Sequence, residues 1–116
     1  MKLGQVGTHI LAEFKTTKHL TDCSAYNSFI RNLLIKSNIN IVGNLEHIFD
    51  TGGYTSSFLL AESHVNIHTW PEFELANIDL FLCNYTEDNS EKAKMLMEEI
   101  EKFFDPYDTE VRIIKR

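Results

Sequence analysis

Two stretches of the sequence carry apolar residues at the spacing of one helical face, and a run of short alternating segments separates them. Each stripe follows an i, i+3, i+4, i+7 pattern, so it predicts an amphipathic helix with one face to bury. We expect one helix over about residues 22–37 and a second that ends before Pro106. The stripes are Tyr26, Phe29, Ile30, Leu33 and Leu34, and Ala93, Leu96, Met97, Ile100 and Phe104. Candidate N-caps are Thr21, Asp22 or Ser24 for the first helix and Asn89 or Ser90 for the second.

Short segments with alternating side chains predict strands beside these helices. The segments are His9–Lys15, Asn40–His47, Tyr54–Ala61, Ala76–Cys83 and Thr109–Ile114. Two helices that each need an apolar surface predict an α+β fold, with both helices on one face of a sheet. The opposite face would then be uncovered, and Asp79 and Cys83 fall on it because they alternate with Ile78 and Leu80. Such a face suits a subunit interface, an active-site wall or a solvated surface.

Length and charge restrict the class of protein. With 116 residues, 43% of them hydrophobic, the chain is expected to form one domain over residues 1–116. The net charge of −6 works against nucleic-acid binding. No apolar run reaches the roughly 20 residues of a membrane helix, and Met1–His9 has no apolar core of a signal peptide. We therefore expect a cytoplasmic protein in which Cys23 and Cys83 are thiols.

The densest polar cluster is AESHVNIHTWPE, over Ala61–Glu72. One interpretation is a metal site, in which His64 and His68 bind an ion together with Cys83 or Glu72. In a strand, however, residues four apart are separated by roughly 13 Å, which is too far to share one ion. We therefore expect no metal.

A second interpretation is a hydrolase that uses Ser63, a histidine and an acid. The small neighbours of a nucleophile elbow are absent, because Glu62 and His64 flank this serine. A third is a solvated hairpin end whose histidine content is a matter of chance.

A longer pattern includes this cluster. The stretch LLAESHVNIHTWPEFELANIDLFLC, Leu59–Cys83, resembles the signature of the prokaryotic S-adenosylmethionine decarboxylases, in which ESH is followed by HTWPE and an acidic strand that ends on a cysteine. GTHILAEF, Gly7–Phe14, is similar to the opening strand of that family, and HIF, His47–Phe49, to its histidine and aromatic residue. The resemblance runs over nearly the whole chain. It implies a two-layer α/β sandwich with a largely antiparallel sheet, and a homodimer of processed protomers.

The resemblance also implies that the protein cuts its own backbone between Glu62 and Ser63 by serinolysis. Residues 1–62 would form a β chain and residues 63–116 an α chain that begins with a pyruvoyl group derived from Ser63. His68 would be the proton acceptor in processing, since an imidazole accepts a proton near neutral pH. The pyruvoyl carbonyl would form a Schiff base with the substrate amine and act as the electron sink for decarboxylation. Cys83 would then be the proton donor.

Other roles follow from the family pattern. Thr55, or less favourably Ser56, would supply the hydroxyl that assists processing, although DTGGYTSS departs from the Pro and Gly usual before it. Phe49, Trp70 and Glu72 would bind the nucleoside of the substrate, with ordinary core packing as the alternative for the two aromatic residues.

The implied activity is decarboxylation of S-adenosylmethionine to the aminopropyl donor for spermidine biosynthesis. Asp50, unexpected beside Phe49, motivates an alternative, the same pyruvoyl chemistry on ornithine or arginine, whose distal charge a carboxylate could pair. A further alternative is a non-catalytic relative that acts as a regulatory partner. His9 and Glu13, on one strand face with Leu11, are expected to support the site or the interface.

Overall fold

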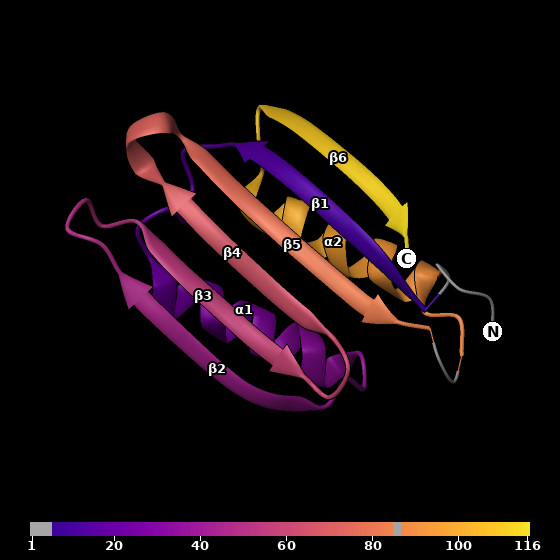
Figure 1. Ribbon diagram of the computed structural model, residues 1–116. Helices are drawn as coiled ribbons and strands as arrows, with labels where there is room; N and C mark the ends of the chain where they lie inside the picture. The colour runs from indigo at the N-terminus through magenta and orange to yellow at the C-terminus, as the bar shows by residue number, and fades with distance from the viewer. Residues whose placement is uncertain (1–5, 85–86) are drawn as a thin grey trace.

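A computed structural model describes residues 6–84 and 87–116 (Figure 1). Residues 1–5, within the segment inspected for an export signal, and residues 85–86 lie outside the described residues. The elements are β1 (Gly7–Lys15), α1 (Cys23–Lys36), β2 (Ile41–Ile48), β3 (Tyr54–Leu60), β4 (His64–Trp70), a 3₁₀ turn (Pro71–Phe73), β5 (Leu75–Cys83), α2 (Ser90–Phe104) and β6 (Asp108–Lys115). In the described part of the chain, no helix is long and apolar enough to cross a membrane.

The strands form one sheet in the order β2-β3-β4-β5-β1-β6, and neighbouring strands are antiparallel. Both helices lie against the same face, α1 over β2 and β3 and α2 over β1 and β5 (Figure 1). This arrangement confirms the predicted α+β, two-layer fold.

The two helices begin and end close to the predicted positions. Asp22, one of the three proposed caps, accepts a hydrogen bond from the Ala25 N–H (3.0 Å) and so satisfies a donor in the first turn of α1. The stripe of α2 is buried, and the C-cap of this helix is Asp105, whose φ of 45° is left-handed, just before Pro106. Burial of these apolar stripes, at about 25 cal/mol per Å², is the main force that holds both helices on the sheet.

The strand that carries the polar cluster, β4, is absent from the strands that we predicted. Its core side is formed by Val65, Ile67 and Thr69, which are buried, and these alternate with His64, Asn66 and His68 on the other side. The period-two alternation was present in the sequence. The histidines and the asparagine hid it, since they belong to a face that no described helix covers.

Candidate active site

Ser63 lies in the turn that joins β3 to β4. The Leu60 N–H donates to the Ser63 carbonyl (2.9 Å) and closes the turn, while Ala61 and Glu62 at its tip are exposed. The Glu62–Ser63 peptide bond is therefore accessible, and it can be cut without breaking a strand.

Cys83 lies beside Ser63 although 20 residues separate them. The register of β4 on β5 pairs His64 with Phe81, which brings the end of β5 level with the turn. The backbone N–H of Cys83 donates to Ser63 Oγ (3.0 Å) and orients the hydroxyl. The structure thus brings Glu62, Ser63 and Cys83 together at this turn.

A cleft of about 440 Å³ borders this turn on one side. Ser63 and Cys83 line it together with Asn89 and Lys92, from the start of α2. Further lining residues, Asn38 and Asn40, come from the connection between α1 and β2.

Thr55 and His68 form a second group on the uncovered face. They are register partners on β3 and β4, and Thr55 Oγ1 lies 2.8 Å from His68 Nδ1. The neighbouring Ser56 points into the helical layer instead, where it is fully buried and donates to Asn27 Oδ1 (2.5 Å). Of the two hydroxyls considered for processing, only that of Thr55 contacts the histidine.

The proposed substrate-binding residues lie at this same end of the sheet. Phe49 follows β2 and its ring stands edge-on to that of His47, with ring centres 5.0 Å apart. Trp70 ends β4, with its ring 5.9 Å from that of His68, and Glu72 is exposed in the 3₁₀ turn. Asp50 is also exposed here, in the turn between β2 and β3.

Buried contacts hold this end in place. Thr69 Oγ1 accepts from the Tyr54 N–H (2.9 Å) and donates to the Leu20 carbonyl (2.7 Å). At Gly53, a Cβ atom would come within 2.7 Å of the Thr69 carbonyl oxygen, so only glycine fits beside the strand. Sequence reasoning missed these residues, because none of them carries reactive chemistry.

The two groups lie at opposite ends of the sheet. The β3–β4 turn and the end of β5 are at one end, and the β2–β3 and β4–β5 connections are at the other (Figure 1). Five residues along a strand span roughly 16 Å, so His68 cannot reach Ser63 within one chain. The structure does not join the implied nucleophile to its implied base.

Between the two groups, Asp79 holds two histidines on the uncovered face. Its Oδ1 accepts hydrogen bonds from Nε2 of His9 and, at 3.2 Å, from Nε2 of His64. Arg116 Nη1 lies 3.2 Å from His9 Nδ1, and a guanidinium can only donate, so His9 carries its hydrogen on Nε2. His64 is thus bonded to a carboxylate, and roughly 13 Å of strand separates it from His68.

These three side chains were not linked by the sequence analysis, which placed Asp79 on the uncovered sheet face and His9 on one strand face with Glu13. Their ligand-type atoms all lie within 4.8 Å of one another, and among the described residues this is the one group of three that could hold a metal ion. The hydrogen bonds to Asp79 account for this proximity. Glu13, which was expected with His9 to support the site or the interface, is exposed.

The second cysteine has no part in either group. Cys23 is buried in α1, where burial, reinforced by the Glu46 carboxylate that accepts its S–H, raises the pKa of the thiol to about 12. Cys23 and Cys83 are both thiols, and no disulfide joins them.

Comparison with known proteins relates this arrangement to one family. A sequence model described as S-adenosylmethionine decarboxylase matches residues 8–116. A protein of Archaeoglobus fulgidus named S-adenosylmethionine decarboxylase proenzyme is 36% identical over 80% of this chain and 85% of its own length. A protein of the same name from Methanococcus maripaludis is 34% identical over 97% of this chain and 90% of its own.

A solved structure agrees with the sequence matches. The crystal structure of the adenosylmethionine decarboxylase from Aquifex aeolicus superposes with a TM-score of 0.84 at 27% identity. The superposition covers 97% of this chain and 91% of that protein.

Proposed function

The chain belongs to the S-adenosylmethionine decarboxylase family, and we propose that it cleaves itself at Ser63 and then decarboxylates S-adenosylmethionine. The product would be the aminopropyl donor for spermidine biosynthesis. The observation that carries the proposal is the hydrogen bond between the Cys83 N–H and Ser63 Oγ at an exposed turn, because it places a nucleophile and an acid at one cleavable bond.

Self-cleavage begins with the attack of Ser63 Oγ on the carbonyl carbon of Glu62. The C–N bond breaks, the nitrogen of residue 63 takes up a proton, and an ester replaces the amide. Loss of the α proton of residue 63 to a base expels the Glu62 carboxylate, which takes Oγ with it. Addition of water and loss of ammonia leave a β chain of residues 1–62 and a pyruvoyl group at the start of residues 63–116.

The pyruvoyl group would supply the electron sink for loss of carbon dioxide from an amino acid, without a metal. This chain's own residues bind and orient the substrate and move protons. Cys83, at the same turn, would return a proton to the substrate's α carbon. Phe49, Trp70 and Glu72 lie at the opposite end of the sheet from Ser63 (Figure 1), so those of a second copy would bind this substrate. The two aromatic rings would stack on the nucleoside, and the Glu72 carboxylate would accept from the ribose hydroxyls. A sulfonium cation is favoured by aromatic faces in an acidic setting.

The base for processing would come from a second copy of the chain. His68 and Thr55 lie too far from Ser63 in their own chain, on a sheet face that no described helix covers. A two-fold axis that packs two such faces together places the His68 end of one copy over the Ser63 end of the other. The exposed apolar side chains Leu45, 81% exposed, and Leu59 on that face would be buried in this dimer.

Substrate assays separate this function from the alternatives. Processed protein is incubated with carboxyl-labelled S-adenosylmethionine, ornithine or arginine, and released carbon dioxide is measured, with Ser63→Ala as the matched control. We expect release from S-adenosylmethionine alone and none from the variant. Release from ornithine or arginine instead would assign Asp50 the role of pairing the distal charge. The absence of release from all three would indicate a non-catalytic relative.

A further inference from the structure

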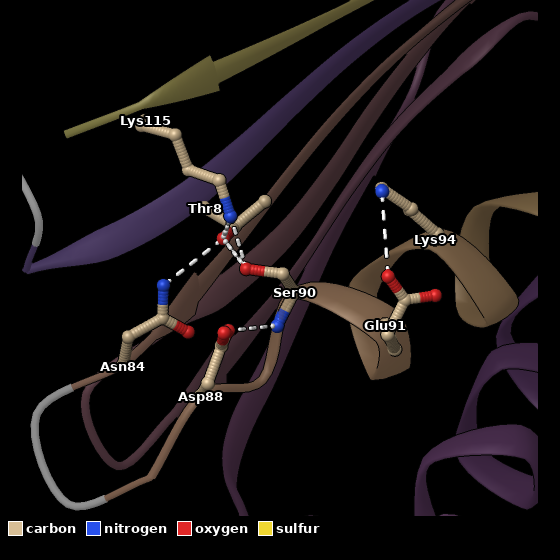
Figure 2. A network of polar contacts seen from close by, with 7 residues as sticks. All are labelled: Thr8, Asn84, Asp88, Ser90, Glu91, Lys94 and Lys115. Atoms are coloured by element: carbon tan, nitrogen blue, oxygen red, sulfur yellow. Dashed lines mark hydrogen bonds and ion pairs between the residues drawn. The ribbon is translucent and has the colours of Figure 1, made fainter.

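The residue at the N-cap of α2 does not cap its helix. Asn89 occupies that position, where an asparagine side chain ordinarily accepts from a free N–H of the first turn, but its side chain makes no such bond. The carboxylate of Asp88 does so instead, since its Oδ1 accepts from the Ser90 N–H (2.9 Å; Figure 2). The Asn89 carboxamide is therefore available for another contact.

That contact is with Cys83. Asn89 Nδ2 donates to the Cys83 carbonyl (2.8 Å), while the Cys83 N–H donates to Ser63 Oγ (3.0 Å). These two bonds hold the peptide units on either side of the Cys83 α carbon. They therefore fix the backbone from which the Cys83 side chain and the Ser63 hydroxyl are oriented.

Asn89 is itself held by a partly buried network of hydrogen bonds. Its backbone N–H donates to Asn84 Oδ1 (2.8 Å), and Asn84 Nδ2 donates to Thr8 Oγ1 (3.0 Å). Thr8 is fully buried and lies 2.8 Å from the buried Ser90 hydroxyl, which Lys115 also contacts (Figure 2). The first turn of α2 is thus anchored to β1 and β6, and this anchoring fixes the position of the Asn89 carboxamide.

We propose that Asn89 is a positioning residue for both self-cleavage and proton delivery, acting through the Cys83 backbone. The inference rests on the proposed function. Before cleavage, the Asn89 contact fixes the N–H that orients Ser63 Oγ. After cleavage Oγ has left with the Glu62 carboxylate, but the bond between Asn89 and the Cys83 carbonyl does not involve that oxygen. Asn89 therefore continues to hold the Cys83 backbone during catalysis.

The test compares Asn89→Asp with Asp88→Ala, a matched change at the same helix end. Asn89→Asp keeps the size of the side chain and a good N-cap, but it turns a carboxylate oxygen towards the Cys83 carbonyl. We expect self-cleavage, followed by denaturing mass spectrometry, to slow by roughly tenfold or more while Tm is retained. Asp88→Ala should lower Tm by a few degrees and cleave at the wild-type rate.

A second readout uses the cleaved proteins. Cleaved Asn89→Asp should have a lower kcat with KM nearly unchanged, because Asn89 does not touch the substrate in this account. If Asn89→Asp does not fold, Asn89→Ser replaces it. Serine is also a good N-cap but is too short to reach the Cys83 carbonyl, so the same loss is expected.

If Asn89→Asp cleaves at the wild-type rate, or if Asp88→Ala is slowed equally, the positioning role of Asn89 is overturned and the proposed function is left intact. A wild-type protein that never cleaves would instead refute the proposed function itself. The two failures are therefore distinct.

Discussion

Thr55 Oγ1 and His68 Nδ1 are 2.8 Å apart on neighbouring strands, and both lie at the opposite end of the sheet from Ser63. A hydroxyl in contact with a ring nitrogen fixes the orientation of the imidazole, and it can do so as donor or as acceptor. In the proposed dimer, this pair would act on Ser63 of the other copy.

The first prediction concerns the two adjacent hydroxyls on β3. Thr55→Ala should slow self-cleavage by about tenfold, because His68 loses the partner that orients its ring, whereas Thr55→Ser should restore most of the rate. Ser56→Ala should cleave normally but lose about 1–3 kcal/mol of stability, since it leaves the half-buried Asn27 carboxamide without the donor that Ser56 supplies. Cleavage time courses and urea denaturation distinguish these outcomes. The opposite pattern would show that Ser56 is the assisting hydroxyl.

A second prediction tests whether two copies share a site. Ser63→Ala lacks the nucleophile and His68→Ala lacks the base, so neither should be cleaved alone. Mixed dimers combine the intact Ser63 of one copy with the intact His68 of the other. Coexpression should therefore yield cleaved His68→Ala chains and intact Ser63→Ala chains, which mass spectrometry resolves. Cleavage of His68→Ala on its own would exclude His68 as the base.

A third prediction concerns the buried thiol. Because burial raises the pKa of Cys23 to about 12, its neutral form is favoured in the folded protein. The contribution of this thiol to stability is complete below the ordinary thiol pKa and is lost as the pH rises from about 9 towards 12. In a Cys83→Ser variant, Cys23 should resist a thiolate-specific reagent at pH 8.5 until denaturant is added. Rapid labelling of the folded variant would contradict its burial.

The fold could largely be predicted from the sequence, because apolar residues record which faces are buried. The two helices could be predicted from the apolar stripes that contain Tyr26 and Leu96, without knowing which strands they pack against. The strand around Val65 and Ile67 was missed, because the polar side chains on its other face, such as His68, obscured the alternating pattern.

The site could be predicted only in part. The proximity of Ser63 and Cys83 followed from a family resemblance and is produced by the register of β4 on β5, which no local pattern encodes. The separation of His68 from Ser63 is a property of strand length and topology. The proposed role of Asn89 could not be predicted from the sequence, which indicated only a helix cap. The contact on which the role depends is with the Cys83 carbonyl, at the end of β5.

The denaturing mass spectrum of purified protein tests self-cleavage at Ser63 most directly. We expect the 13.4 kDa chain to be replaced by residues 1–62 and residues 63–116, with one water gained and one ammonia lost between them. Ser63→Ala should stay whole. A wild-type chain that keeps its full mass after prolonged incubation would contradict the account.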